Sequence, residues 1–217
     1  MPIRAVIFDM DGVLLDTEKL LYKYWLQAAR ELGYPLEPEH ALDLRSLAGT
    51  FAETYLRERV SPDIDYNLLR RRRRELMNGD LAANGIPAKP GAKELLESLR
   101  ARGVKTAVAT ATDEPRTRKY LAEIGILQLF DHICCATMVA NGKPMPDVYL
   151  FACAQLGETP ENCVAVEDSS NGVLSAYRAG CKVAMVPDLT EPDEQTAAML
   201  TYKAESLSHL QKILEVY

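Results

Sequence analysis

The stretch Ala5-Val6-Ile7-Phe8-Asp9-Met10-Asp11-Gly12-Val13 joins a short apolar run to a turn that carries two carboxylates. A short apolar run rich in β-branched residues that ends at Asp is typical of a strand buried in a parallel sheet. Later runs have the same character and are likewise bounded by Asp, Gly or Pro. They are residues 104–109, 132–135, 163–166 and 182–186. We therefore predict strands over all of these runs.

Helical patterns alternate with the predicted strands. They cover residues 92–102, 116–124, 147–156 and 170–179, and each closes on a glycine, which is a frequent residue just beyond a helix C-terminus. Strands that alternate with helices favour a parallel sheet, because each crossover places a helix on a face of the sheet. The predicted fold class is α/β, with a Rossmann-like parallel sheet core and helices on both faces.

One block interrupts this alternation. Between residues 17 and 86 no strand pattern occurs, and the helix-like segments are residues 20–32, 39–47, 50–60 and 67–77. An all-helical block inserted after the first strand predicts a second, smaller domain. We expect this helical domain over residues 17–86 and the sheet-containing core over residues 1–16 and 87–217.

The bulk composition excludes several classes of protein. The 217 residues carry a net charge of −6, which argues against general attraction to nucleic acid or to an anionic membrane. The five cysteines have no zinc-ligand spacing, and Cys163 and Cys181 each begin an apolar run, as expected of core residues in a reducing compartment. The first apolar run is too short for a signal peptide. We expect a cytoplasmic location; the oligomeric state stays open, and a monomer is plausible.

Two carboxylates follow the first predicted strand. Asp9 and Asp11 would both lie at the carboxyl edge of the sheet, where open α/β folds place their functional sites. Such close carboxylates repel unless a cation lies between them or one carries a proton. Mg²⁺ on Asp9 with a protonated Asp11 would suit phosphoryl transfer. The alternatives are a plain Asp- and Gly-rich turn and a calcium loop, but Gly12 is fourth in the loop and an EF-hand needs it sixth.

Three further features follow other predicted strands. Thr110 and the backbone N–H of Ala111 precede a helix and could cradle a phosphate, although Thr110 could equally cap a turn. Lys143 lies between Gly and Pro, where a fixed ammonium could contact phosphate oxygens. Glu167 and Asp168 are hard oxygen ligands suited to Mg²⁺, and one of them could instead cap the next helix. Together these residues predict a phosphate and metal site.

These four motifs resemble those of the haloacid dehalogenase superfamily, in its subgroup of beta-phosphoglucomutases and small sugar-phosphate phosphatases. Residues 9–17 resemble the first motif, Thr110 the second, Lys143 the third, and the Glu167-Asp168 pair the fourth. The resemblance implies that Asp9 is the nucleophile and Asp11 the general acid/base. It covers nearly the whole chain and implies that the helical block is a cap that closes over the site.

The resemblance also implies the metal ligands. Mg²⁺ would be held by the Asp9 side chain, the backbone carbonyl of Asp11 and the carboxylate of Asp168, with Glu167 joining in some relatives. An acid at the position of Asp11 points to hydrolysis or isomerisation of phosphomonoesters, since halide-displacing members lack it.

Mutases of the subgroup carry a His and a cap Arg where this chain has Leu21 and Ala52, with Arg45 as the alternative for the Arg. We therefore expect a Mg²⁺-dependent phosphatase that acts on small phosphorylated metabolites, such as sugar phosphates, through an aspartyl-phosphate. The alternatives are a beta-phosphoglucomutase-like mutase and, from another class, a non-catalytic phospho-accepting or binding protein.

Five consecutive arginines, residues 70–74, form the most conspicuous charge run. Five successive residues spread around most of a helix circumference and make no single stripe. The functional alternatives for this run are nucleic-acid binding and capture of an anionic substrate. We expect instead a solvated helix face with acidic partners such as Glu75.

Overall fold

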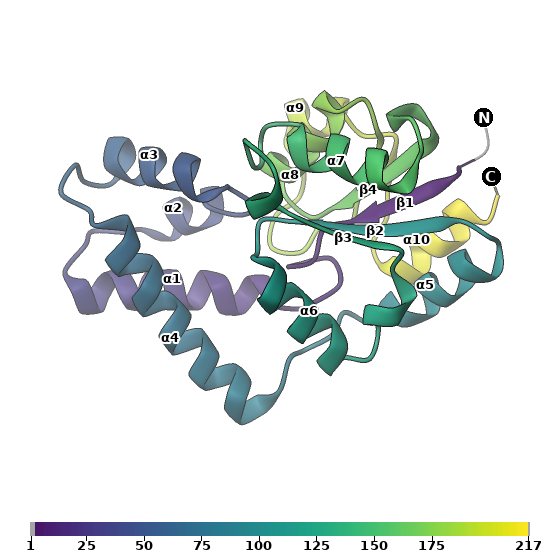
Figure 1. Cartoon of the computed structure of the whole chain (residues 1–217). Coiled ribbons are helices and arrows are strands. Elements are labelled where there is room, and N and C mark those ends of the chain that lie inside the picture. The colour runs from purple at the N-terminus through teal and green to yellow at the C-terminus, as the bar shows by residue number, and fades with distance from the viewer. Residues whose placement is uncertain (1–2, 217) are drawn as a thin grey trace.

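A six-stranded parallel sheet forms the centre of the computed structural model, which describes residues 3–216 (Figure 1). The strands are β1 (Ala5–Phe8), β2 (Lys105–Thr110), β3 (His132–Cys135), β4 (Cys163–Glu167), β5 (Lys182–Met185) and β6 (Tyr202–Lys203). Their order is β3-β2-β1-β4-β5-β6, so β1 lies in the interior of the sheet. The predicted Rossmann-like α/β fold is confirmed.

Helices cover both faces of the sheet. Val6 and Phe8 of β1 face an apolar cluster that includes residues of α5 (Ala92–Ala101), α6 (Glu114–Glu123) and α10 (Leu207–Leu214). Ala5 and Ile7 face a second cluster, with α7 (Asp147–Leu156) and α8 (Ser170–Arg178). Both faces of β1 are therefore buried, as an uninterrupted apolar run requires. The remaining elements of this part are α9 (Glu194–Ala198) and the 3₁₀ helices η1 (Leu127–Leu129), η2 (Ala136–Met138) and η3 (Pro160–Asn162).

Four helices form a lobe beside the sheet, on the left in Figure 1. They are α1 (Glu18–Leu32), α2 (Pro38–Asp43), α3 (Gly49–Arg59) and α4 (Tyr66–Asn84). We call residues 18–84 the helical lobe. Its own apolar cluster includes Trp25, Leu56 and Leu69, all buried. The absence of strands predicted for this block is confirmed within the lobe, although α2 ends earlier than residue 47 and α4 continues beyond residue 77.

The two crossings between lobe and sheet lie side by side. The Asp16 N–H donates to the Pro87 carbonyl at 2.9 Å, and the Lys89 N–H donates to the Leu14 carbonyl at 2.9 Å. The ammonium of Lys89 also bridges Asp16 at 3.1 Å and Asp188 at 2.7 Å. The outgoing and returning segments are thus joined by backbone bonds and one shared cation.

Across residues 3–216, no helix combines the length and apolarity that a membrane crossing requires. All five cysteines are buried and unbridged, so Cys163 and Cys181 are core residues, as predicted.

Candidate active site

The candidate site lies at the carboxyl ends of three neighbouring strands. Asp9 directly follows β1, Thr110 ends β2 and Glu167 ends β4. The chain passes to one side of β1 for β2 and to the other side for β4, and such a reversal opens a crevice above the strand ends. The Asp9 N–H donates to the Val166 carbonyl at 2.9 Å, which fixes the turn against β4.

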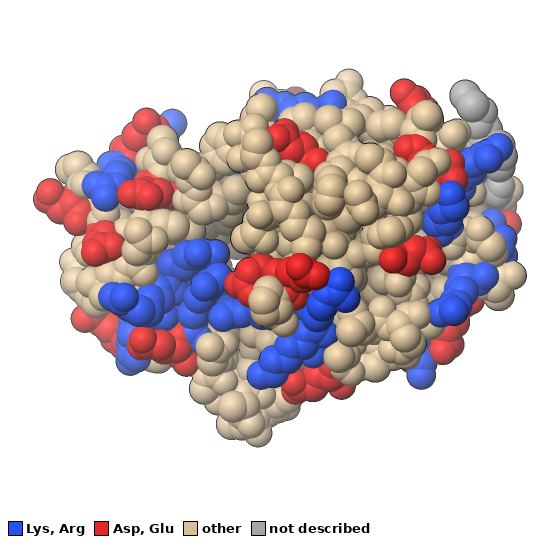
Figure 2. Space-filling model, viewed as in Figure 1, with Lys and Arg blue, Asp and Glu red and all other residues tan. Residues whose placement is uncertain are grey.

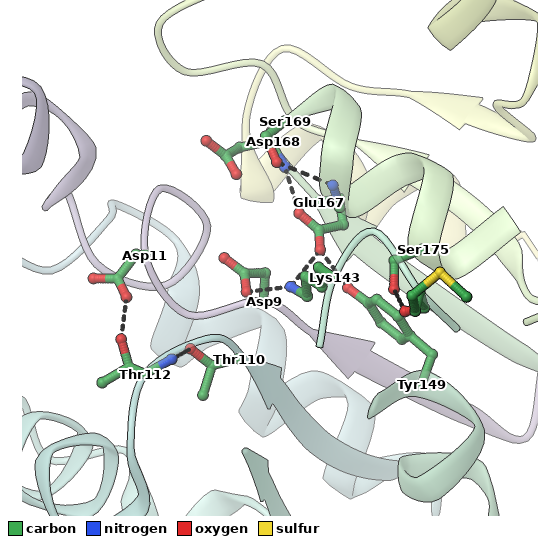
Figure 3. A network of polar contacts seen from close by, with 12 residues as sticks. Asp9, Asp11, Thr110, Thr112, Lys143, Tyr149, Glu167, Asp168, Ser169 and Ser175 are labelled. Carbon is green, nitrogen blue, oxygen red and sulfur yellow. Dashed lines mark hydrogen bonds and ion pairs between the residues drawn. The ribbon is translucent and has the colours of Figure 1, made fainter. Parts of the chain in front are cut away.

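Lys143 connects two of the predicted site carboxylates (Figure 3). Its ammonium lies 2.5 Å from Asp9 Oδ1 and 2.6 Å from Glu167 Oε1, and the side chain is fully buried. Burial alone would lower the pKa of Lys143, but the two carboxylates reverse this effect and raise the pKa above its ordinary value. Lys143 is therefore a fixed cation beside Asp9. Burial is also the largest influence on Asp9 and raises the pKa of its carboxyl, against the opposing effect of Lys143.

Three buried carboxylates form a cluster with the character of a cation site. Asp9, Glu167 and Asp168 each offer an oxygen within 4.8 Å of the others. Neither carboxylate oxygen of Asp168 has a hydrogen-bond partner among residues 3–216. Burial and then Glu167 raise the pKa of Asp168 to about 8. Crowded, unsatisfied carboxylates are costly unless a cation compensates them. The set of hard oxygens fits Mg²⁺.

Gly12 makes room for this cluster. Its φ is 86°, and a Cβ there would overlap the carboxylate of Asp168. A side chain at this position would therefore be strained by the backbone and would also displace Asp168.

Asp11 is held by two hydroxyl groups. Thr17 Oγ1 donates to Asp11 Oδ1 at 2.6 Å, and Thr112 Oγ1 donates to Asp11 Oδ2 at 3.0 Å. The Thr112 N–H in turn donates to Thr110 Oγ1 at 3.1 Å. Asp11 is thereby oriented by the residue that precedes α1 and by the segment that follows β2. Asp9, Asp11, Thr110 and Ala111 all line one pocket.

The helical lobe supplies the rest of that pocket. Leu21 and Ala52, which stand where mutases carry His and Arg, both line it. Arg45, in the loop after α2, also lines it and places Nη1 3.6 Å from Asp168 Oδ2. Its Nη2 bonds the Thr190 hydroxyl. Arg45 thus joins the lobe to the buried carboxylate cluster.

The prediction of a solvated helix face is wrong for part of the arginine run. Arg72 does pair outward with Glu75 at 3.0 Å, but Arg73 is buried, and Arg70, Arg73 and Arg74 line the pocket. The reason is that one side of α4 faces the sheet across the pocket, which the sequence of α4 alone cannot reveal.

Two site residues were not singled out from the sequence. Tyr149 in α7 donates to Glu167 Oε1 at 2.5 Å. Glu18 is buried, and burial, followed by Asp168 and Asp11, raises the pKa of its carboxyl. Glu18 directly follows the first motif, so its position was a usable signal. Tyr149 is the second residue after Asp147 in an apolar helix and carries no pattern that separates it from a core tyrosine.

The sequence matches known proteins over most of its length. The model of the haloacid dehalogenase-like hydrolases matches residues 3–180. Hexitol phosphatase A of Escherichia coli is 34% identical over 201 residues, which cover 89% of this chain and 90% of that protein. The phosphorylated carbohydrates phosphatase of Thermotoga maritima is 30% identical over 177 residues, or 82% of each chain.

Solved structures share the whole fold. CbbY from Rhodobacter sphaeroides, in complex with phosphate, has a TM-score of 0.78 at 28% identity and covers 96% of both chains. A HAD family hydrolase from Deinococcus radiodurans, with bound phosphate and sodium, has a TM-score of 0.74 at 31% identity and covers 99% of this chain and 96% of its own. The similarity therefore includes the helical lobe as well as the sheet.

Proposed function

The chain belongs to the haloacid dehalogenase-like hydrolases and is an enzyme that hydrolyses phosphomonoesters, and we propose that it does so with Mg²⁺ through an aspartyl-phosphate on Asp9. The observation that carries this proposal is the buried contact of Lys143 with Asp9 and Glu167, at 2.5 and 2.6 Å. Asp9 itself lines the pocket. A carboxylate in this setting is oriented and its charge is offset, as a nucleophile toward an anionic phosphate requires.

In the proposed reaction, Asp9 Oδ2 attacks phosphorus while Lys143 holds Oδ1. The bond from phosphorus to the ester oxygen breaks, and Asp11 gives its proton to that leaving oxygen. Asp11 then takes a proton from water, whose oxygen attacks the same phosphorus. Phosphate leaves and the Asp9 carboxylate is restored. Thr17 and Thr112 keep Asp11 in position through both proton transfers.

Three carboxylates and one carbonyl would hold the metal. We assign the side chains of Asp9, Asp168 and Glu167 and the backbone carbonyl of Asp11 to this role. When bound, Mg²⁺ offsets the negative charge of the phosphate and of the carboxylate cluster. Thr110, the Ala111 N–H and Lys143 would bind the phosphoryl oxygens.

We also propose that residues 17–86 form a cap domain over a catalytic core of residues 1–16 and 87–217. Three features support this division: the helical lobe has an apolar cluster of its own, its two connections to the sheet lie side by side, and it forms part of the pocket wall. The names of the relatives favour sugar phosphates or similar metabolites as substrates. The cytoplasmic location stays a prediction.

The test is phosphate release from p-nitrophenyl phosphate by the purified protein with saturating Mg²⁺. Asp9→Asn should lower kcat by about 10³-fold or more, because no other group replaces the nucleophile. The wild type, quenched during turnover, should carry a phosphoryl group on the peptide that contains Asp9. Full activity of Asp9→Asn would refute the proposal. Hexose 1-phosphates test the mutase alternative, which predicts an isomerised sugar phosphate in place of free phosphate.

A further inference from the structure

The arginine run of α4 divides into two sets. Arg71 is exposed, and Arg72 pairs outward with Glu31 at 2.6 Å and with Glu75. Arg70, Arg73 and Arg74 instead line the pocket that contains Asp9, as does Arg116 of α6. Figure 2 shows basic side chains gathered over the first half of α4 and reaching the hollow between the lobe and the sheet. We call Arg70, Arg73, Arg74 and Arg116 the arginine cluster.

Arg73 is the most constrained member of the arginine cluster. It is 7% exposed, its guanidinium lies 4.9 Å from the ring centre of Trp25, and its Nη1 lies 3.8 Å from Met77 Sδ. Its Nε is buried with no hydrogen-bond partner among residues 3–216. Burial, and then the neighbouring arginines, lower the pKa of Arg73 to about 10, so the side chain is still cationic at neutral pH. A buried cation with an unused donor requires an anion for compensation.

The protein itself compensates only part of this charge. Arg74 pairs with Asp113 at 3.2 Å, and its Nε is also buried without a hydrogen-bond partner in the described chain. Within residues 3–216 the side chains of Arg70 and Arg116 make no hydrogen bond or ion pair. Like charges that converge without partners repel one another. The arginine cluster therefore has the character of a binding site, in which an anionic ligand would supply the missing negative charge.

We propose that the arginine cluster binds a second anionic group, a phosphate or a carboxylate, on the same molecule whose phosphoester lies at Asp9. This inference rests on the proposed function for the reacting end of the substrate. The reacting phosphate has its own groups at the sheet, namely Lys143, Thr110 and Ala111, whereas the arginine cluster comes from α4 and α6. Guanidinium groups hold planar and tetrahedral oxyanions through paired N–H donors. The preferred substrates would thus be small phosphomonoesters with a second charged end.

Two substrate pairs test this proposal. Each pair differs only at the far end: 3-phosphoglycerate against glycerol 3-phosphate for a carboxylate, and fructose 1,6-bisphosphate against fructose 6-phosphate for a phosphate. We expect kcat/KM of the wild type to be at least about tenfold higher for one or both charged members. The member without the second charged group cannot make the hydrogen bonds to charged groups that the arginine cluster offers, and the loss of one such bond lowers kcat/KM by about this factor. Arg70→Gln and Arg116→Gln should each remove most of this ratio, mainly through KM. Arg71→Gln, in the same run but on the exposed side, is the matched control.

The outcomes separate this proposal from the proposed function. Equal kcat/KM within both pairs, or an unchanged ratio in Arg70→Gln and Arg116→Gln, would overturn it. Equal losses for both members of a pair would show that the arginines hold the reacting phosphate instead. Calorimetric titration of the Asp9→Asn protein with the charged member measures binding without turnover. If this binding depends on Arg70 and Arg116 while the wild type releases no phosphate from the same compound, the anion site is upheld and the hydrolytic mechanism is rejected.

Discussion

Asp168 is a buried acid whose charge the folded chain leaves largely uncompensated. Its nearest cation, Arg45, is 3.6 Å from Oδ2, beyond hydrogen-bond reach, while Glu167 crowds it from the other side. A side chain in this position gains more from a bound cation than from any contact within the protein. The energetic consequence is that metal binding and stability should be coupled at this residue.

Asp168→Asn should therefore remove most of the stabilisation that Mg²⁺ gives to the wild type. A ligand present at about 100 times its Kd stabilises the folded state by about 2.7 kcal/mol. We expect a clear rise in the Tm of the wild type on addition of Mg²⁺, and a much smaller rise for Asp168→Asn. Asp63→Asn, at an exposed position of the lobe, serves as the control. A full Mg²⁺-dependent shift in Asp168→Asn would exclude Asp168 as a ligand.

Tyr149 positions Glu167 through a buried hydrogen bond of 2.5 Å. Tyr149→Phe keeps the ring and removes only the donor, which leaves Glu167 with the Lys143 ammonium at 2.6 Å and the Asp168 N–H at 3.3 Å. We expect a loss of about 1–3 kcal/mol in the free energy of unfolding, measured by urea denaturation. Tyr177→Phe at a 53% exposed position should change this free energy by less than about 0.5 kcal/mol. Equal effects of the two changes would mean that the Tyr149 hydroxyl contributes nothing specific.

At the scale of elements, apolar runs located the strands well. β1 and β3 coincide with the predicted ranges, and β2 is displaced by one residue, because strands buried on both faces have no polar positions to blur the pattern. β6, with two residues, was too short to be found. α2 ends at Asp43 because the following loop turns toward the sheet, where the Ala48 N–H donates to the Lys143 carbonyl at 3.0 Å. Such tertiary contacts are invisible in local sequence.

The contact between Ala48 and the Lys143 loop depends on the glycine at position 142. A Cβ on Gly142 would collide with the side chain of Ala48. Gly142→Ala should therefore push the lobe away from the Lys143 loop, and we expect kcat/KM to fall by about tenfold or more through misplacement of the pocket wall. Overpacking should also cost about 1–3 kcal/mol of stability. The measurement is steady-state kinetics at a temperature where the variant is folded.

Gly79→Ala is the matched control, because a Cβ at this helical position would have no described atom within 4 Å beyond the adjacent backbone of its own helix. Alanine there should raise stability by about 0.5–1 kcal/mol with kinetics unchanged. Unchanged kinetics in Gly142→Ala as well would show that the loop adapts and that the contact between Ala48 and Lys143 does not shape the site.

At the scale of the whole molecule, the sheet explains what could be predicted of the site. Asp9 follows β1, and the Glu167-Asp168 pair lies at the end of the neighbouring β4, so strand order brings these carboxylates to one edge. Lys143 lies in the long segment after β3, which carries it across β2 to the same edge. Arg73 and its neighbours come from the helical lobe, whose placement depends on packing between distant segments. The sequence shows that α4 is basic, but only the assembled fold shows which arginines face Asp9.

The same packing predicts that the lobe and the sheet unfold as one cooperative unit. Tyr24 of α1 and Met77 and Leu81 of α4 are buried in the apolar cluster that also contains Phe8 of β1. Unfolding of either part would expose surface on the other, which favours a single transition. The sole tryptophan, Trp25, lies in the lobe, so its fluorescence reports the lobe while far-UV circular dichroism reports the whole chain. We predict coincident thermal midpoints for the two signals.

A core change confined to the lobe gives the sharper test of this cooperativity. Leu56 is fully buried in the cluster formed within the lobe, and Leu56→Ala should cost about 2–5 kcal/mol through cavity formation. If the two parts unfold together, both midpoints fall by the same amount. Leu150→Ala, at a 44% exposed position on α7, should leave both nearly unchanged. If only the fluorescence midpoint falls, the lobe unfolds independently and the shared cluster is too weak to couple it to the sheet.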